Sequence, residues 1–149
     1  MPVYLRNATR KSGLDSASIE RTVTALLTAI GERESSISVS FVRDPAMRRL
    51  NRAHRGKDAP TDVLSFPLVD VENAFAGAER LLGDVVISVD SARRQAADYD
   101  ATLEREVERL LIHGVLHLVG HDHLEAEERA RMEREERRLA AAIGMPWPY

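Results

Sequence analysis

The sequence predicts an α+β fold, in which a single small domain has a roughly four-stranded sheet packed against about five helices. Short stretches that alternate between apolar and polar residues, such as residues 37–42, predict strands. They are interspersed with longer stretches whose apolar residues recur every three or four positions, such as residues 15–33, which predict helices. The chain has 149 residues, of which 44% are hydrophobic, and no long linker or repeat, so we expect one domain over 1–149.

The first part of the chain predicts two strands around a helix. Val3–Arg6 and Ile37–Val42 alternate between apolar and polar residues, as strands with one buried face do. Between them, Asp15 is expected to cap a helix that runs to about Arg33. The apolar stripe of this helix consists of Ile19, Val23, Leu26, Leu27 and Ile30.

A second helix is predicted between Asp44 and Arg55. Asp44 is a favourable N-cap residue, and Pro45 fits the first helical position because the N–H that proline lacks has no helical partner there. Gly56 can take the left-handed conformation that commonly follows a helix. The segment Pro60–Pro67 predicts a strand at the edge of the sheet, since proline cannot donate to a strand ladder.

The second half of the chain predicts one more strand and three helices. Residues 68–80 are expected to form a loop or hairpin connection to a strand at Gly83–Ser88. The three helices are predicted from Ser88 or Asp90 to Asp98, from Thr102 to Val119, and from Leu124 to Ile143. The last of them is rich in charges, which is typical of a solvated helix face with pairs of opposite charge.

Composition narrows the class of protein. The chain has no cysteine, so a zinc site would have to use histidine or carboxylate ligands. The first fifteen residues lack the apolar core of a signal peptide, and no apolar run approaches the roughly 18 residues of a membrane span. We therefore expect a cytoplasmic protein without a membrane partner.

The charges are distributed unevenly along the chain. Residues 1–60 carry 11 Lys and Arg against 6 Asp and Glu, a balance of +5, whereas residues 61–149 carry 10 against 18, a balance of −8, and together they give the net charge of −3. Nearly all the basic residues are arginine, which suits bidentate recognition of phosphate. A general preference for arginine codons explains the composition equally well.

Four of the five histidines fall in residues 113–123, HGVLHLVGHDH. His113 and His117 lie one turn apart on a predicted helix, and Gly120 allows a sharp turn at the helix end that brings His123 back toward them. This spacing predicts a metal site at the end of a helix, in which three imidazole ligands leave a fourth position open for catalysis. Imidazoles without a thiolate favour zinc, with one Zn²⁺ per chain, and leave nickel, copper or iron as alternatives.

The sequence allows more than one role for each of two residues beside these histidines. His121 can be a ligand, a substrate contact or a bystander. Asp122 can orient a ligand imidazole or cap the last helix.

The residue after the first histidine distinguishes this motif from that of zinc proteases. Those enzymes have a glutamate there as general base, and this chain has Gly114. Cleavage of a peptide bond usually needs such a proton carrier, whereas phosphoryl transfer needs a metal and a nearby cation that stabilises charge on the phosphoryl oxygens. The missing glutamate therefore favours a phosphodiester substrate.

Arg55 is the candidate for that cation. It ends the predicted basic helix, whose residues Arg48, Arg52 and Arg55 share one face. The alternative is that Arg55 only caps its helix or pairs with Asp58 or Asp62.

Three segments together resemble the YbeY family of bacterial ribosomal-RNA maturation endoribonucleases: NRAHRGKDAPTDVLSFP at 51–67, LLGDVVIS at 81–88 and HGVLHLVGHDH at 113–123. The resemblance implies an α+β fold with a metal in a cleft between helices and sheet. It implies His113, His117 and His123 as zinc ligands and Arg55 as a functional arginine. It also implies cleavage of single-stranded RNA in maturation of the small-subunit rRNA 3′ end and in ribosome quality control, with ribosomal proteins or an assembly GTPase as partners.

Two other functions remain open from the residues alone. The first is a metal-dependent hydrolase of a non-RNA bond, in which a water or a distant residue such as Glu106 replaces the missing base. The second is a non-catalytic RNA-binding factor for ribosome assembly, in which zinc only shapes the site.

Overall fold

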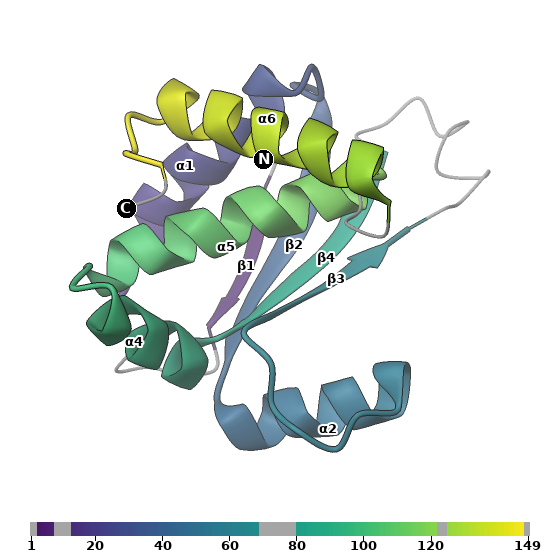
Figure 1. Ribbon diagram of the computed structural model, residues 1–149, viewed down its shortest axis with the longest axis vertical. Helices are drawn as coiled ribbons and strands as arrows, with labels where there is room; N and C mark the ends of the chain where they lie inside the picture. The colour runs from purple at the N-terminus through teal and green to yellow at the C-terminus, as the bar shows by residue number, and fades with distance from the viewer. Residues whose placement is uncertain (1–2, 8–12, 69–79, 122–124, 148–149) are drawn as a thin grey trace.

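The computed structural model describes residues 3–7, 13–68, 80–121 and 125–147. The described residues form a mixed sheet with the strand order β1-β2-β4-β3, together with five helices (Figure 1). The elements are β1 (Val3–Asn7), α1 (Ser16–Ala29), β2 (Ser35–Val42), α2 (Asp44–Arg55), β3 (Val63–Pro67), β4 (Arg80–Ser88), α4 (Val89–Asp98), α5 (Leu103–Leu118) and α6 (Ala126–Ala142). The α+β class that the sequence predicts is confirmed.

Strand direction changes at one edge of the sheet. Strands β1, β2 and β4 are parallel to one another, whereas β3 is antiparallel to β4 and is the outermost strand on its side. The predicted edge position of the proline-bracketed strand is therefore confirmed. The connection between β3 and β4, expected as a loop or hairpin, consists of residues that lie almost wholly outside those described.

The main hydrophobic core lies on one face of the sheet. Helices α1, α5 and α6 lie together on that face (Figure 1). They pack against side chains that alternate along the two central strands, as the period of two in a strand requires. The strand residues in this core include Ile37, Val39, Phe41, Val85 and Ile87.

Helix α2 covers part of the opposite face. Its buried Met47 packs with Leu64 of β3 and Val86 of β4, whose side chains point away from the main core. Leu50, Val42 and Phe66 extend this second cluster at its margin. The chain thus has a large core on one side of the sheet and a small one on the other, and β3 contributes to both.

The helix ends differ from prediction in places. Helix α1 ends at Ala29 rather than near Arg33, because the chain turns at Gly31, whose φ is +79°. Asp44 is not the N-cap of α2: Arg43 takes that position, and the Asp44 carboxylate instead accepts hydrogen bonds from Ser88 and Ser91 of the β4–α4 junction. Asp44 therefore links the N-terminus of α2 to the N-terminus of α4.

Other predicted ends agree with the structure. Ser88, one of the two predicted starts of α4, is its N-cap and accepts a hydrogen bond from the Ser91 N–H, and Thr102 caps α5 in the same manner. Gly56 follows α2 in the left-handed conformation. None of the helices among the described residues is long and apolar enough to cross a membrane.

Helix α5 lies unusually close to the sheet at Gly114. A Cβ atom on this residue would be 2.8 Å from Cγ1 of Val85 and 3.3 Å from Oγ of Ser65. The Ser65 hydroxyl donates a hydrogen bond to the Gly114 carbonyl oxygen at 3.1 Å. Glycine is therefore required at position 114 by the packing of α5 on β3 and β4.

We predict that Gly114→Ala lowers the free energy of unfolding although alanine favours helix. Overpacking costs about 1–3 kcal/mol, against roughly 1 kcal/mol that alanine gains over glycine in a helix. Chemical denaturation should show the reverse in a Val85→Ala background, where Gly114→Ala should stabilise because the methyl group occupies the vacated space. A destabilisation of equal size in both backgrounds would contradict this account of Gly114.

Candidate functional site

A cavity of about 550 Å³ lies where α5, β3 and the C-terminal end of α2 meet. It contains both kinds of candidate that the sequence indicates, namely the histidines of α5 and the arginine that ends α2. The residues that line it are Arg55, Thr61, Asp62, Val63, Leu64, Ser65, Pro67, His113, His117, Gly120 and His121. Segments far apart in the sequence thus form one concave site.

His113 and His117 point the same ring atom at one another. Their Nε2 atoms are 3.0 Å apart, and the ring centroids are 4.5 Å apart. Two nitrogens that each lie about 2.0–2.1 Å from a tetrahedral zinc ion are separated by roughly 3.3 Å. The pair can therefore bind one ion, although the spacing also suits a hydrogen bond between a donating and an accepting imidazole.

The third predicted ligand, His123, lies outside the described residues, as does Asp122. Within the described part of the chain, which omits 122–124, no group of three histidine, aspartate or glutamate residues is placed to hold a metal ion. Gly120 has φ +100°, so the sharp turn predicted after α5 is present. His121 follows this turn and lines the cavity.

Arg55 lines the cavity from the end of α2. The alternative pairings expected for it are not found: Asp58 binds Arg48 at 2.8 Å, and Asp62 binds residues of α4 and α5. None of the ion pairs among the described residues includes Arg55. Its guanidinium is therefore available to an anionic ligand, whereas that of Arg48 is partly neutralised.

The loop from α2 to β3 is fixed in place by Asn51, a residue that the sequence reasoning missed. Its buried side-chain amide donates to the Ala59 carbonyl oxygen at 2.8 Å. The loop then delivers Thr61 and Asp62 to the cavity wall. The available signal was an asparagine four residues after Met47, on the apolar face of a basic helix.

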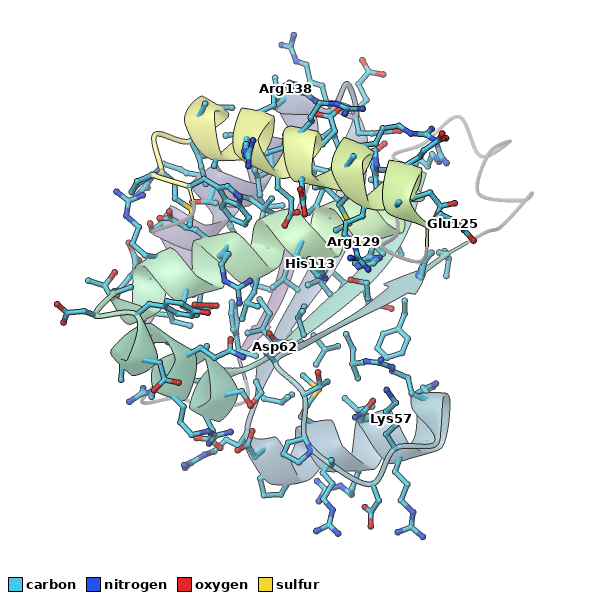
Figure 2. The ribbon with its side chains drawn as sticks, viewed as in Figure 1. Lys57, Asp62, His113, Glu125, Arg129 and Arg138 are labelled. Carbon is cyan, nitrogen blue, oxygen red and sulfur yellow. The ribbon has the colours of Figure 1, made fainter. Side chains whose placement is uncertain are left out.

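Asp62 was considered only as a partner for Arg55, yet it has its own place in the cavity. One carboxylate oxygen accepts a hydrogen bond from the Val63 N–H, and the other accepts one from the Gln95 amide and lies 3.8 Å from Arg109. Figure 2 shows Asp62 between α5 and α2, with His113 on α5. Asp62 thus joins the cavity wall to α4 and α5.

Glu106, suggested as a distant replacement for the missing base, cannot act as one in this structure. Its side chain is fully buried, does not line the cavity and is bound by Arg109. Burial raises the pKa of Glu106, although the Arg109 guanidinium opposes the shift. The carboxyl group belongs to the interior, where Arg109 links it to Asp62.

Glu136 of α6 was also missed. It is only 7% exposed, and one of its carboxylate oxygens lies 3.9 Å from Nδ1 of His113. The carboxylate therefore faces the nitrogen on the far side of the ring from the His117 contact. A signal was present, because Glu136 falls on the apolar stripe of α6 between Met132 and Leu139, where a charge is unexpected.

The absent glutamate of the protease motif has a steric explanation. Gly114 faces Val85 and Ser65 of the sheet and does not line the cavity. A glutamate at this position would have no room, and the described cavity wall has no carboxylate other than Asp62. The site therefore differs from that of a zinc protease in its backbone packing as well as in one side chain.

Comparisons with known proteins agree on one family. Residues 4–144 match the family model described as "Endoribonuclease YbeY". A relative of that name from Pelotomaculum thermopropionicum is 43% identical over 97% of this chain and 99% of its own, and one from Alkaliphilus metalliredigens is 44% identical over 83% and 80%. A protein of Thermotoga maritima, solved in solution, shares the fold with a TM-score of 0.59 and 24% identity, covering 95% of this chain and 91% of its own. With the family model and relatives over most of its length in agreement, the chain belongs to the endoribonuclease YbeY family.

Proposed function

We propose that the protein is a zinc-dependent endoribonuclease that cleaves single-stranded RNA. The observation that carries the proposal is the shared cavity, which combines His113 and His117 of α5 with Arg55 of α2. Relatives over most of the chain bear the name endoribonuclease, which supports RNA as the substrate. The Arg55 guanidinium, which forms no ion pair with a described residue, supports a substrate with anionic phosphates.

The donor atoms suit zinc. The two Nε2 atoms converge on one point, no thiolate is available in the sequence, and imidazole is a preferred zinc ligand. His113, His117 and His123 would hold the ion. When bound there, zinc would supply a Lewis acid that activates water and stabilises charge on the phosphoryl oxygens.

Glu136 would orient the first ligand. Its carboxylate can accept a hydrogen bond from a protonated Nδ1 of His113, which leaves the Nε2 lone pair directed into the cavity. The separation of 3.9 Å is longer than a hydrogen bond, so the contact would need a small movement of the ring or carboxylate, or a water between them. Burying a carboxylate costs free energy. The contact with His113 would explain why Glu136 is buried despite this cost.

Arg55 would bind the phosphate that is cleaved. Its planar guanidinium can donate to two phosphoryl oxygens at once and stabilise the charge that develops on them. A glutamate base is not required for this role, whereas cleavage of a peptide bond needs a proton carrier for the amine. The cavity therefore favours phosphodiester cleavage over peptide hydrolysis.

The proposed process is maturation of the small-subunit rRNA 3′ end and ribosome quality control. Ribosomal proteins or an assembly GTPase would then be its partners. Support for this process comes from the resemblance to the family in the segments at 51–67, 81–88 and 113–123.

The metal assignment predicts that His117→Ala reduces the zinc content from about one ion per chain to near zero, because two remaining ligands hold zinc poorly. Metal analysis of purified protein checks this. The matched control is His54→Ala, since His54 lies exposed on α2 against Phe66 and does not line the cavity. Full zinc occupancy in His117→Ala would contradict the assignment.

The orienting role predicts that Glu136→Leu weakens zinc binding roughly 10- to 100-fold, as loss of such partners typically does. Stability of the metal-free protein should stay level or rise, since a buried charge is replaced by an apolar group. Titration against a competing chelator measures the affinity, and thermal unfolding measures the stability. Glu133→Leu, on the exposed face of α6, is the control and should bind zinc normally. Normal zinc affinity in Glu136→Leu would remove Glu136 from the site.

The activity is tested by single-turnover cleavage of RNA with zinc-loaded and zinc-stripped protein. The substrates are a strand that spans the mature 3′ end of the small-subunit rRNA, a shuffled strand of equal length and a duplex. We expect cleavage of single strands by the loaded protein alone, with Arg55→Lys slower by roughly a hundredfold to a thousandfold because lysine loses the bidentate contact.

Arg52→Lys is the matched control, as Arg52 lies on the same helix but does not line the cavity. Zinc content and thermal stability should be unchanged in both variants. A near-normal rate in Arg55→Lys and Arg55→Ala would exclude Arg55 from catalysis. Zinc-dependent cleavage of unstructured peptides but not of RNA would overturn the proposed function.

A further inference from the structure

The outer edge of β3 presents main-chain hydrogen-bonding groups to the cavity. The Ser88 N–H donates to the Asp62 carbonyl, and the Leu68 N–H donates to the Leu82 carbonyl, each at 2.9 Å. Because the direction of these groups alternates along an antiparallel strand, the main-chain groups of Val63, Ser65 and Pro67 point away from β4. No described strand other than β4 pairs with β3.

Ser65 supplies the outward N–H donor that remains on this edge, beside its own carbonyl and those of Val63 and Pro67. The Val63 N–H already donates to the Asp62 carboxylate, and Pro67 has no N–H. The Ser65 hydroxyl is occupied by the Gly114 carbonyl. Its main-chain N–H and C=O therefore form a donor next to an acceptor, directed outward from the sheet, and such groups are normally satisfied by water or a ligand.

The strand edge separates the two parts of the site. His113 and His117 belong to α5, which covers the core face of the sheet, and Arg55 belongs to α2, which covers the other face. Figure 1 shows β3 as the outermost strand, between these helices. A ligand that contacts the histidines and Arg55 together must pass the main chain of β3.

We propose that the Ser65 N–H and C=O bind the Watson–Crick edge of a nucleobase beside the cleaved phosphate. Each nucleobase has a donor next to an acceptor on that edge, so one main-chain pair can accept any of the four. In a duplex the same edge is occupied by the complementary base. The contact therefore accounts for selectivity toward single strands with little selectivity for sequence, and it rests on the proposed endoribonuclease function.

The test combines a protein change with a substrate change. Ser65→Pro removes the outward N–H without affecting a bond to β4, and proline is tolerated at such edge positions. Ser65→Ala is the control, because it loses only the hydroxyl. The substrates are an oligouridylate and the same strand built from N3-methyluridine, which lacks the base donor. Zinc content and thermal unfolding verify that the variants are intact.

For wild type, methylation should weaken binding and kcat/KM by roughly tenfold, the usual worth of one or two hydrogen bonds. Ser65→Pro should weaken binding and cleavage of the uridine RNA to a similar extent. It should change binding of the methylated RNA little, because the methyl group already keeps the base edge away from the strand, so that neither of the two paired hydrogen bonds remains to be lost. Ser65→Ala should retain the wild-type difference between the two RNAs. If methylation weakened binding to Ser65→Pro as much as it weakens binding to wild type, the two effects would be independent, and the inference would be overturned.

Other outcomes are equally decisive. Equal binding and cleavage of both RNAs by wild type would overturn the base contact without any variant, so the test survives if Ser65→Pro fails to fold. Failure of zinc-loaded wild type to cleave either RNA would reject the proposed function itself, whereas loss of the methylation effect alone rejects only this inference.

Discussion

The close contact between α5 and the sheet at Gly114 determines how the site is built. With no side chain at this position, the helix backbone reaches Val85 and accepts the Ser65 hydrogen bond. The helix is thereby fixed against the edge of the sheet with His113 and His117 facing the cavity. The same contact excludes the glutamate of zinc proteases, so the packing that places the two histidines also excludes a carboxylate at position 114.

Buried charge is concentrated around this helix. Glu106 lies on one side of α5 and is linked through Arg109 to Asp62 at the cavity wall, while Glu136 approaches His113 from α6. Burying carboxylates costs free energy that apolar residues would not incur. Both carboxylates lie near groups that reach the cavity: Glu106 binds Arg109, which lies 3.8 Å from Asp62, and Glu136 lies 3.9 Å from Nδ1 of His113.

Local signals predicted most of the fold and part of the site. Alternation, proline and glycine placement located the strands and helices, and the histidine spacing located the face of α5 that lines the cavity. Arg55 was found because it ends a helix before a glycine. Glu136 and the place of Asp62 in the cavity wall were missed since they depend on contacts between segments distant in sequence. Asn51 was missed although its partner, the Ala59 carbonyl, is close along the chain. Asp44 was misassigned because two serines of another junction bind its carboxylate. The third histidine lies outside the described residues, so its place in the site stays a prediction.

Helix α2 is packed against fewer buried residues than α5. The histidines belong to a helix enclosed by the main core, whereas α2 rests on a cluster of three buried residues and is tied by Asp44, at its first turn, to the start of α4. Arg55 lies at the opposite end, about 16 Å away along a twelve-residue helix. A small tilt about the tied end therefore displaces Arg55 more than any other residue of α2. A change in the tilt of α2 would therefore change the width of the cavity at Arg55 and leave His113 and His117 in place.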